Sequence, residues 1–194
     1  MTFSVLFVCT GNICRSPMAE RLFRARVDPA VPITAASAGT AGLPDWPMDA
    51  PSALALRELG GDPDGHAGRR LTEAMVADAD LILTAETTHR SVIVQADPPA
   101  FRRAFTLREF GRLGAALGPL GAPVTVDALR ERVGEVAAQR GNAEPAEPGA
   151  DDIGDPFGAP LTVARMCAAE VATAVDLVIS ALGLQRAQAL GSWS

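Results

Sequence analysis

Lysine is absent from the 194-residue sequence, so all 17 basic residues are arginines. Two enzyme classes depend on a lysine side chain, namely nucleotide hydrolases with a Walker-type phosphate loop and enzymes that form a Schiff base with their substrate. Tyrosine is also absent, so no tyrosine of this chain is available for phosphorylation. The sequence therefore excludes both lysine-dependent chemistries and control through its own phosphotyrosine.

The sequence also has few features that direct a chain to a membrane, to nucleic acid or out of the cell. No apolar run reaches the roughly 18 residues of a membrane-spanning helix, and no basic residue precedes the first apolar stretch as it would in a signal peptide. The formal net charge of -6 disfavours binding to nucleic acid or to an anionic membrane. Only three cysteines occur, and Cys9 and Cys14 share one short loop, so the chain lacks a secreted disulfide framework. We expect a soluble, cytoplasmic protein without nucleic-acid or membrane partners.

Hydrophobic residues make up 48% of the chain, which is enough for one sizeable core. Their spacing predicts strands at 3–8, 33–38, 81–84 and 104–107, and helices at 17–27, 50–59, 71–79, 86–95 and 161–182. Strands that alternate with helices indicate a parallel sheet covered on both faces. We therefore predict an α/β fold: a single three-layer domain over residues 1–194, with a four-stranded parallel sheet in the order 2-1-3-4 flanked by helices and a ligand loop after strand 1.

Residues 112–152 differ from the rest in being richer in alanine, glycine and proline. One helix is predicted there, at 126–140, followed by a flexible stretch, GNAEPAEPGADD, at 141–152. We interpret 112–152 as an insertion in the domain. It forms a surface helix with a linker, or it lies over the functional site or binds a partner.

The segment with recognisable chemistry is CTGNICRS, residues 9–16, between the first strand and the first helix. A tight glycine-containing loop at a helix N-terminus aims its backbone N–H groups at one point, where they bind phosphate oxygens. Arg15 adds a planar, bidentate cation, and the same donors would stabilise a nucleophilic thiolate at Cys9. The alternative is a buried cysteine at a strand end and a surface arginine. We expect the phosphate to be bound by Thr10, Gly11, Asn12, Ile13, Cys14 and Ser16.

The string VLFVCTGNICRSPMAE, residues 5–20, resembles the signature of the low-molecular-weight protein tyrosine phosphatases, and the resemblance covers residues 3–110 and 150–183. It implies that Cys9 is the nucleophile and Arg15 the phosphate clamp. It also implies a general acid in an Asp-Pro-aromatic turn before the last helix, which here is Asp155 in Asp155-Pro156-Phe157. Asp151 and Asp152 are the nearest alternatives for the acid.

The resemblance also implies residues that support the loop or contact the substrate. Ser37, in AASAGT, would hydrogen-bond behind the phosphate loop, and His66 would orient Asn12. A slot for an aryl group would be lined by Thr10, Ile13, Trp46 and Phe157. For Trp46 the alternative is packing on the body of the protein.

Three features depart from the family's pattern. Ala85-Glu86 stands where the family usually has Met-Asp, so an acid is kept but lengthened. Gly158 replaces a second aromatic residue after Asp155-Pro156. The stretch before Asp155 is longer than usual because of the insertion.

Together these features imply a cysteine-dependent phosphatase that hydrolyses phosphotyrosine-type aryl phosphate monoesters through a phosphocysteine intermediate. We expect no metal and no other cofactor. The expected partner is a phosphotyrosine protein or a small aryl phosphate, and the expected state is a monomer or weak dimer. Three alternatives stay open: a small-metabolite phosphatase on the same scaffold, an arsenate reductase, and a non-catalytic phosphate-binding module. An arsenate reductase passes oxidation along further cysteines after the third strand, and residues 80–100 contain none.

Overall fold

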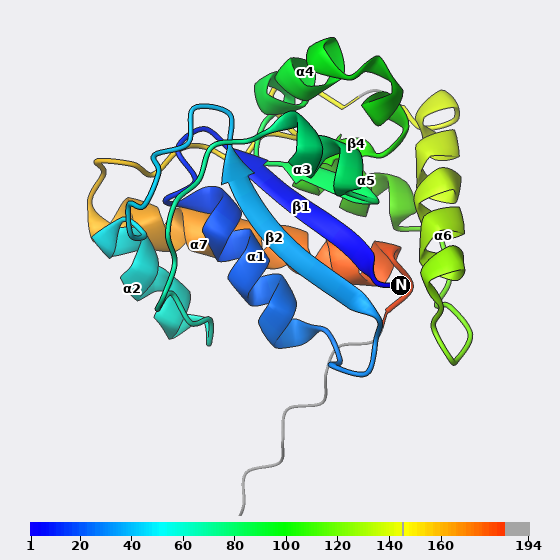
Figure 1. The fold of residues 1–194 in the computed structure, drawn as a ribbon, viewed down its shortest axis with the longest axis horizontal. Helices are drawn as coiled ribbons and strands as arrows, with labels where there is room; N and C mark the ends of the chain where they lie inside the picture. The colour runs from blue at the N-terminus through cyan, green and yellow to red at the C-terminus, as the bar shows by residue number, and fades with distance from the viewer. Residues whose placement is uncertain (145, 185–194) are drawn as a thin grey trace, which may run out of the picture.

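Four parallel strands form the central sheet of the computed structural model, which describes residues 1–144 and 146–184 (Figure 1). The strands lie in the order β2-β1-β3-β4 and all their pairings are parallel. Their bounds are Phe3–Cys9 for β1, Ile33–Gly39 for β2, Leu81–Thr84 for β3 and Ala104–Thr106 for β4. This confirms the predicted α/β fold and strand order. Since β2 and β3 lie on opposite sides of β1, the carboxyl ends of β1 and β3 flank the crevice in which such sheets bind ligands.

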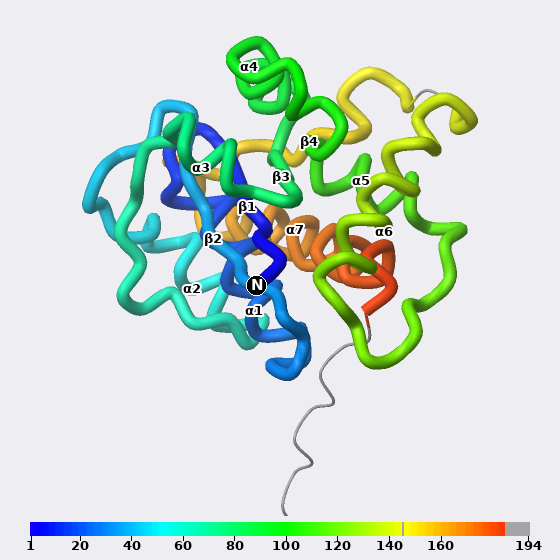
Figure 2. The backbone as a smooth tube through the Cα atoms, turned by 45° about the vertical axis from the view of Figure 1, so that its right-hand side comes forward, coloured from blue at the N-terminus to red at the C-terminus, as the bar shows by residue number. Residues whose placement is uncertain are grey.

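Alternate residues of β1 enter two different hydrophobic cores, because successive side chains of a strand point to opposite faces. Phe3, Val5 and Phe7 belong to the larger core, and Leu6 and Val8 to the smaller one. Figure 2 shows α3 and α4 on one side of the strands and α1 and α7 on the other. The larger core is covered by α1 (Arg15–Arg26), α2 (Ala50–Glu58), α5 (Leu107–Gly114), α6 (Val126–Ala138) and α7 (Leu161–Ala181). The smaller core is covered by α3 (Glu73–Asp78) and α4 (Thr87–Ala96).

The helices differ from the prediction mainly at their ends and in two missed elements. The helix predicted at 71–79 is shorter because the side chain of Thr72 caps it, accepting a hydrogen bond from the backbone of Met75. Helix α5 and a 3₁₀ helix, η1 (Pro98–Arg102), are absent from the prediction. At α5, Thr106 ends β4 and also caps the helix: its hydroxyl accepts from Glu109 N at 3.0 Å, and the Glu109 carboxylate accepts from Thr106 N at 3.2 Å. This capping box starts the helix without an intervening loop.

The inserted segment packs on the same core as the rest of the chain. After α6 a 3₁₀ helix, η2 (Gln139–Gly141), presents Arg140, whose guanidinium carbon lies 4.4 Å from the ring centre of Phe101 and 4.0 Å from that of Phe105. Arg140 Nε donates to the Glu109 carboxylate at 2.9 Å. The apolar side chains that α6 buries in the larger core are Leu129, Val133 and Val136. Within the stretch predicted to be flexible, residues 142–144 and 146–152 form neither helix nor strand, and Pro145 lies outside the described residues.

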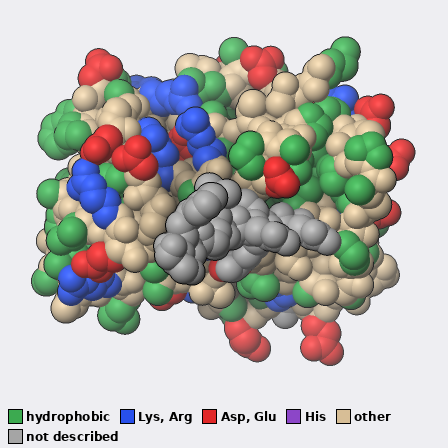
Figure 3. Space-filling view, turned by 90° about the horizontal axis from the view of Figure 1, so that it is seen from below, with side chains coloured by type: hydrophobic (Ala, Val, Ile, Leu, Met, Phe, Trp, Pro, Cys, Tyr) green, Lys and Arg blue, Asp and Glu red, His purple; other side chains and the backbone are tan. Residues whose placement is uncertain are grey.

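Charged side chains of both signs occur on the face of the molecule that Figure 3 shows. On the face seen in Figure 3, blue basic and red acidic side chains lie next to one another. Arg165 on α7 and Glu58 on α2 pair at 2.6 Å, and Arg112 on α5 pairs with Asp151 at 2.8 Å. Within 1–144 and 146–184, no helix is both long and apolar enough to cross a bilayer.

Candidate active site

The loop of residues 9–16 joins the carboxyl end of β1 to the N-terminus of α1. Cys9 is 2% exposed, and its Sγ lies 3.0 Å from Ser16 Oγ, a hydroxyl that can donate to a thiolate. Asn12 has a φ of 57°, in the left-handed region that asparagine tolerates better than most residues. The neighbouring strand contributes Gly39, at which a Cβ atom would lie only 2.3 Å from the carbonyl oxygen of Thr10. The loop is therefore curled tightly against β2.

Asn12 holds the loop in shape from within. Its side chain is fully buried, and Nδ2 donates to Ser16 Oγ and to Ser37 Oγ at 2.9 Å each. Its Oδ1 accepts from the backbone N–H of Arg69 at 2.9 Å. His66 Nε2 lies 2.7 Å from the carbonyl oxygen of Asn12, and because a carbonyl only accepts, Nε2 carries the proton. The structure thus brings both residues expected in supporting positions, Ser37 and His66, into contact with Asn12.

Arg15 is 1% exposed and is surrounded by oxygen acceptors. Its Nη1 donates to Glu86 and, at 2.8 Å, to the carbonyl oxygen of Ile153. Its Nη2 lies 2.8 Å from Asp155 Oδ2. Burial alone would lower the pKa of Arg15, but the charges of Cys9, Glu86 and Asp155 together raise it above its ordinary value. The guanidinium is thereby held as a permanent cation beside the Cys9 thiol.

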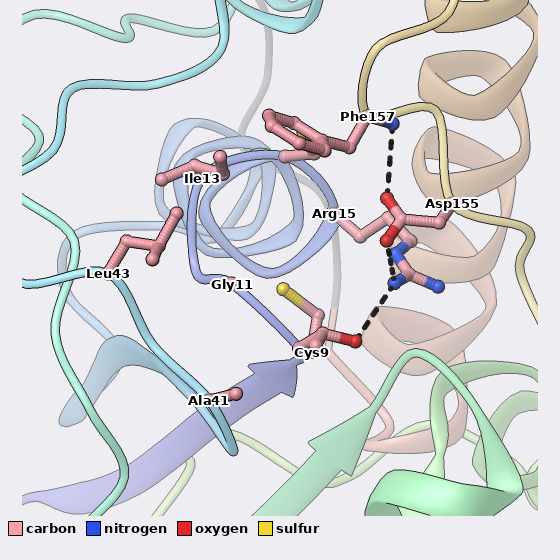
Figure 4. A pocket seen from close by; sticks show the side chains of 10 residues that line it. Cys9, Gly11, Ile13, Arg15, Ala41, Leu43, Asp155 and Phe157 are labelled. Atoms are coloured by element: carbon pink, nitrogen blue, oxygen red, sulfur yellow. Dashed lines mark hydrogen bonds and ion pairs between the residues drawn. The ribbon is translucent and has the colours of Figure 1, made fainter.

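These side chains border a cavity of about 220 Å³ at the carboxyl end of β1 (Figure 4). In Figure 4, Ile13 and Leu43 form one wall, Arg15 and Asp155 stand opposite them, and Cys9 lies between the two sides. The lining consists of Cys9, Thr10, Gly11, Ile13, Cys14, Arg15, Ala41, Leu43, Asp155 and Phe157. The cavity therefore combines an apolar wall with a thiol, a cation and a carboxylate.

Trp46, predicted to line the substrate slot, is not among the residues that line this cavity. It is 54% exposed, and Leu43 of the same loop contributes to the wall instead. Between the two residues the chain turns at Asp45, which has a φ of 63°. The backbone of Trp46 then pairs with that of Gly68, whose N–H donates to the Trp46 carbonyl at 2.8 Å. The turn and this pairing decide which side chain of the loop reaches the cavity, and neither is apparent from the sequence.

Asp155 reaches the cavity on a segment tied to the end of β3 and the start of α4. Ile153 N donates to the carbonyl oxygen of Ala85 at 2.9 Å. Asp152 Oδ1 accepts from Thr87 N at 2.7 Å, where a carboxylate also favours the positive end of the α4 dipole. These contacts place Asp155, two residues further on, beside Arg15.

The two alternative acids are engaged elsewhere. Asp152 binds the N-terminus of α4, and its carbonyl oxygen accepts from Arg108 of α5 at 2.9 Å. Asp151 pairs with Arg112 at 2.8 Å. Neither lines the cavity, so Asp155 is the acidic residue of this segment that faces Cys9.

The sequence profile of the low molecular weight phosphotyrosine protein phosphatase family matches residues 4–116. The chain belongs to this family. The matched part ends two residues after α5, near the start of the inserted segment, and it contains the whole loop of residues 9–16.

The chain resembles individual members of the family over different shares of its length. The low molecular weight protein-tyrosine-phosphatase Etp of Escherichia coli K12 is 46% identical over 95 residues, which cover 49% of this chain and 62% of that protein. A protein-arginine-phosphatase of Bacillus subtilis is 32% identical over 143 residues, covering 70% of this chain and 95% of that protein. Among solved structures, a low molecular weight protein tyrosine phosphatase from T. tengcongensis superposes with a TM-score of 0.66 at 29% identity, covering 92% of this chain and 99% of that one. The YwlE arginine phosphatase of Geobacillus stearothermophilus gives 0.66 at 26% identity, with coverage of 92% and 91%.

Two residues that follow β3 contact the site, although the sequence did not predict them as site residues. Glu86, noted in the sequence only as a lengthened acid, is an ion-pair partner of Arg15. Its contact with Arg15 lowers the pKa of the Glu86 carboxyl, although burial opposes the shift. His89 is 5% exposed, and its Nε2 lies 2.8 Å from Thr10 Oγ1. Their position after a strand next to β1 was the available signal, because carboxyl ends of parallel strands meet at one edge.

The remaining cysteines are protonated thiols at neutral pH. Burial raises the pKa of Cys14 to about 12 and that of Cys167 to about 12. All three cysteines of the chain are free. In the part of the chain that the structure describes, no group of three or more histidine, cysteine or acidic side chains is arranged to hold a metal ion.

Proposed function

We propose that this protein is a cysteine-dependent phosphatase that hydrolyses phosphotyrosine-type aryl phosphate monoesters through a phosphocysteine at Cys9. The observation that carries this proposal is the single cavity lined by the Cys9 thiol, the Arg15 guanidinium and the Asp155 carboxyl. Backbone N–H groups of the loop and Arg15 would hold the phosphoryl oxygens. Arg15 Nε is buried and has no hydrogen-bond partner among the described residues, so it is free to donate to such an oxygen.

In the first step the Cys9 thiolate attacks phosphorus, an S–P bond forms, and the P–O bond to the leaving group breaks. Asp155 donates a proton to the leaving oxygen. In the second step the Asp155 carboxylate accepts a proton from water, whose oxygen attacks the phosphocysteine and releases phosphate and the thiolate. The developing charge on the phosphoryl group is stabilised by Arg15, which is already oriented by Glu86 and Ile153.

The preference for an aryl ester follows from the apolar wall. Ile13, Leu43 and Phe157 line the cavity, and they would pack against an aromatic ring and shield it from water. Serine and threonine phosphates lack such a ring and would leave the wall uncovered.

A phosphoarginine substrate is the second candidate, because relatives that this chain matches over most of their length are named protein-arginine-phosphatases. A substrate guanidinium needs acceptors for its N–H groups. The one carboxylate that lines the cavity, within the described residues, is Asp155, and it is already paired with Arg15. The apolar wall therefore favours phosphotyrosine over phosphoarginine.

The test compares kcat/KM for peptides of one sequence that carry phosphotyrosine, phosphoarginine or phosphoserine, together with a panel of metabolite phosphates. We expect the phosphotyrosine peptide to be the best substrate and Cys9→Ala to abolish its hydrolysis. Leu43→Ala should lower the ratio of phosphotyrosine to phosphoserine activity, whereas Leu54→Ala, at an exposed position on α2, should leave it unchanged. A larger kcat/KM for phosphoarginine, or for a metabolite phosphate, would overturn the proposed substrate.

We further propose that the enzyme acts in the cytoplasm as a monomer or weak dimer. The three free cysteines support a reducing compartment, in which the Cys9 thiol stays available for chemistry.

A further inference from the structure

A buried histidine contacts the phosphate loop from outside the cavity. Helix α4 begins next to the carboxyl end of β3 (Figure 2), and His89 lies in its first turn. The imidazole Nε2 lies 2.8 Å from the hydroxyl oxygen of Thr10. Thr10 directly follows the proposed nucleophile and lines the cavity, whereas His89 does not line it. The hydrogen bond to Thr10 therefore gives His89 a direct route by which it can influence a bound phosphoryl group.

The surroundings of the ring decide which nitrogen of His89 carries the proton. Nδ1 is buried, and among the described residues it has no hydrogen-bond partner. A buried N–H group without an acceptor is destabilising, whereas an unprotonated ring nitrogen without a donor costs less free energy. Burial also lowers the pKa of His89, so the ring is neutral at pH 7. The proton of the neutral ring therefore lies on Nε2, and Nε2 donates to Thr10.

The protein donors around the Thr10 hydroxyl determine whether it accepts or donates a hydrogen bond in the cavity. Its oxygen accepts from His89 Nε2 and, at 3.5 Å, from Arg15 Nη2. A hydroxyl has two acceptor positions and one hydrogen, so both acceptor positions are used by protein donors. The single hydrogen of Thr10 is left to point into the cavity that Thr10 lines.

We propose that His89 is a positioning residue that turns the Thr10 hydroxyl into a donor to the phosphoryl group. The hydroxyl would then add a side-chain hydrogen bond to those of the backbone N–H groups and Arg15. This inference rests on the proposed function only in that the cavity binds phosphate. It assigns to α4 a part in substrate binding.

The experiment measures the dissociation constant of inorganic phosphate by calorimetry for His89→Gln, His89→Asn and Thr10→Val. A glutamine amide reaches the position of Nε2 and can still donate to Thr10, whereas an asparagine amide reaches only the position of Nδ1. We expect His89→Asn and Thr10→Val each to weaken phosphate binding about 10-fold, the loss of one hydrogen bond to a charged group. His89→Gln should bind phosphate within about twofold of the wild type. Ser91→Ala, at an exposed position of the same helix, is the matched control.

The double variant Thr10→Val, His89→Asn separates positioning from a general loss of packing. If His89 acts through Thr10, the double variant binds phosphate no more weakly than Thr10→Val alone. The proposal would be overturned if the loss of phosphate affinity in the double variant equalled the product of the two single losses. Equal losses of affinity in His89→Gln and His89→Asn would also overturn it. The proposal would also be overturned if the His89 variants unfolded more easily but bound phosphate with normal affinity. If His89→Asn fails to fold, an unchanged phosphate affinity in Thr10→Val would overturn it. Because phosphate binding needs no turnover, these outcomes are distinguishable from a failure to hydrolyse phosphotyrosine.

Discussion

Asn12→Ala should destabilise the protein by about 4 kcal/mol although it removes only a small polar group. The Asn12 side chain is 0% exposed and makes three hydrogen bonds, to Ser16, Ser37 and the backbone of Arg69. Their net contribution is about 3 kcal/mol at roughly 1 kcal/mol each. The φ of 57° adds about 1 kcal/mol, because alanine tolerates the left-handed region less well than asparagine.

Asp45 offers a matched control, since it has nearly the same backbone conformation, with a φ of 63°, at an exposed position. Asp45→Ala should therefore cost only the backbone part, about 1 kcal/mol. Asn12→Gly should be less destabilising than Asn12→Ala by that same amount, since glycine adopts positive φ freely.

The assay is urea unfolding of wild type, Asn12→Ala, Asn12→Gly and Asp45→Ala, followed by circular dichroism. With an m value of about 2 kcal/mol/M, the expected shift of the midpoint for Asn12→Ala is about 2 M. Equal losses for Asn12→Ala and Asp45→Ala would refute the reasoning, because the three buried hydrogen bonds would then contribute nothing.

Three further predictions concern the acid, the second loop cysteine and pH. Asp155→Asn should slow hydrolysis of aryl phosphates with basic leaving groups by about 10²–10⁴-fold and affect activated esters much less; equal losses across a leaving-group series would move the acid elsewhere. After peroxide treatment and reduction, Cys14→Ser should recover less activity than the wild type, since a neighbouring thiol captures a Cys9 sulfenic acid as a disulfide; recovery should improve at high pH, because burial raises the pKa of Cys14 to about 12. Burial lowers the pKa of His66, so its neutral form stabilises the fold above about pH 6.5, and that contribution is lost as pH falls through the folded pKa. The stability advantage of wild type over His66→Gln should accordingly shrink between about pH 7.5 and pH 5.5 in urea unfolding, and a constant difference would show that His66 does not titrate with folding.

The sheet was predictable because its strands are short apolar runs bounded by polar or glycine-containing turns. The predicted strand at 81–84 coincides with β3, whose four residues are all buried. Helix α5 shows where the pattern was harder to interpret. Its capping box, Thr106 and Glu109, is visible in the sequence. However, the helix follows β4 without a loop, and β4 has only three residues. So short a strand shows too little alternation of apolar residues to locate the boundary between β4 and α5.

The site was predictable where one contiguous loop carries it and less so where distant segments meet. Cys9 and Arg15 share a loop whose chemistry is evident from the sequence, and the structure places both beside Asp155. Glu86 and His89 reach the same place only because β3 lies beside β1. The choice of Leu43 over Trp46 depends on a turn and a backbone pairing, which side-chain patterns do not encode.

The central claim is that hydrolysis passes through a phosphoryl group on Cys9. The most direct measurement is an acid quench of the enzyme during turnover of a phosphotyrosine peptide, followed by digestion and mass spectrometry of the peptide that contains residues 9–15. The mechanism predicts a phosphoryl group on Cys9 in the wild type, and neither that group nor hydrolysis in Cys9→Ala. A phosphoryl group on another residue, or continued hydrolysis by Cys9→Ala, would contradict it.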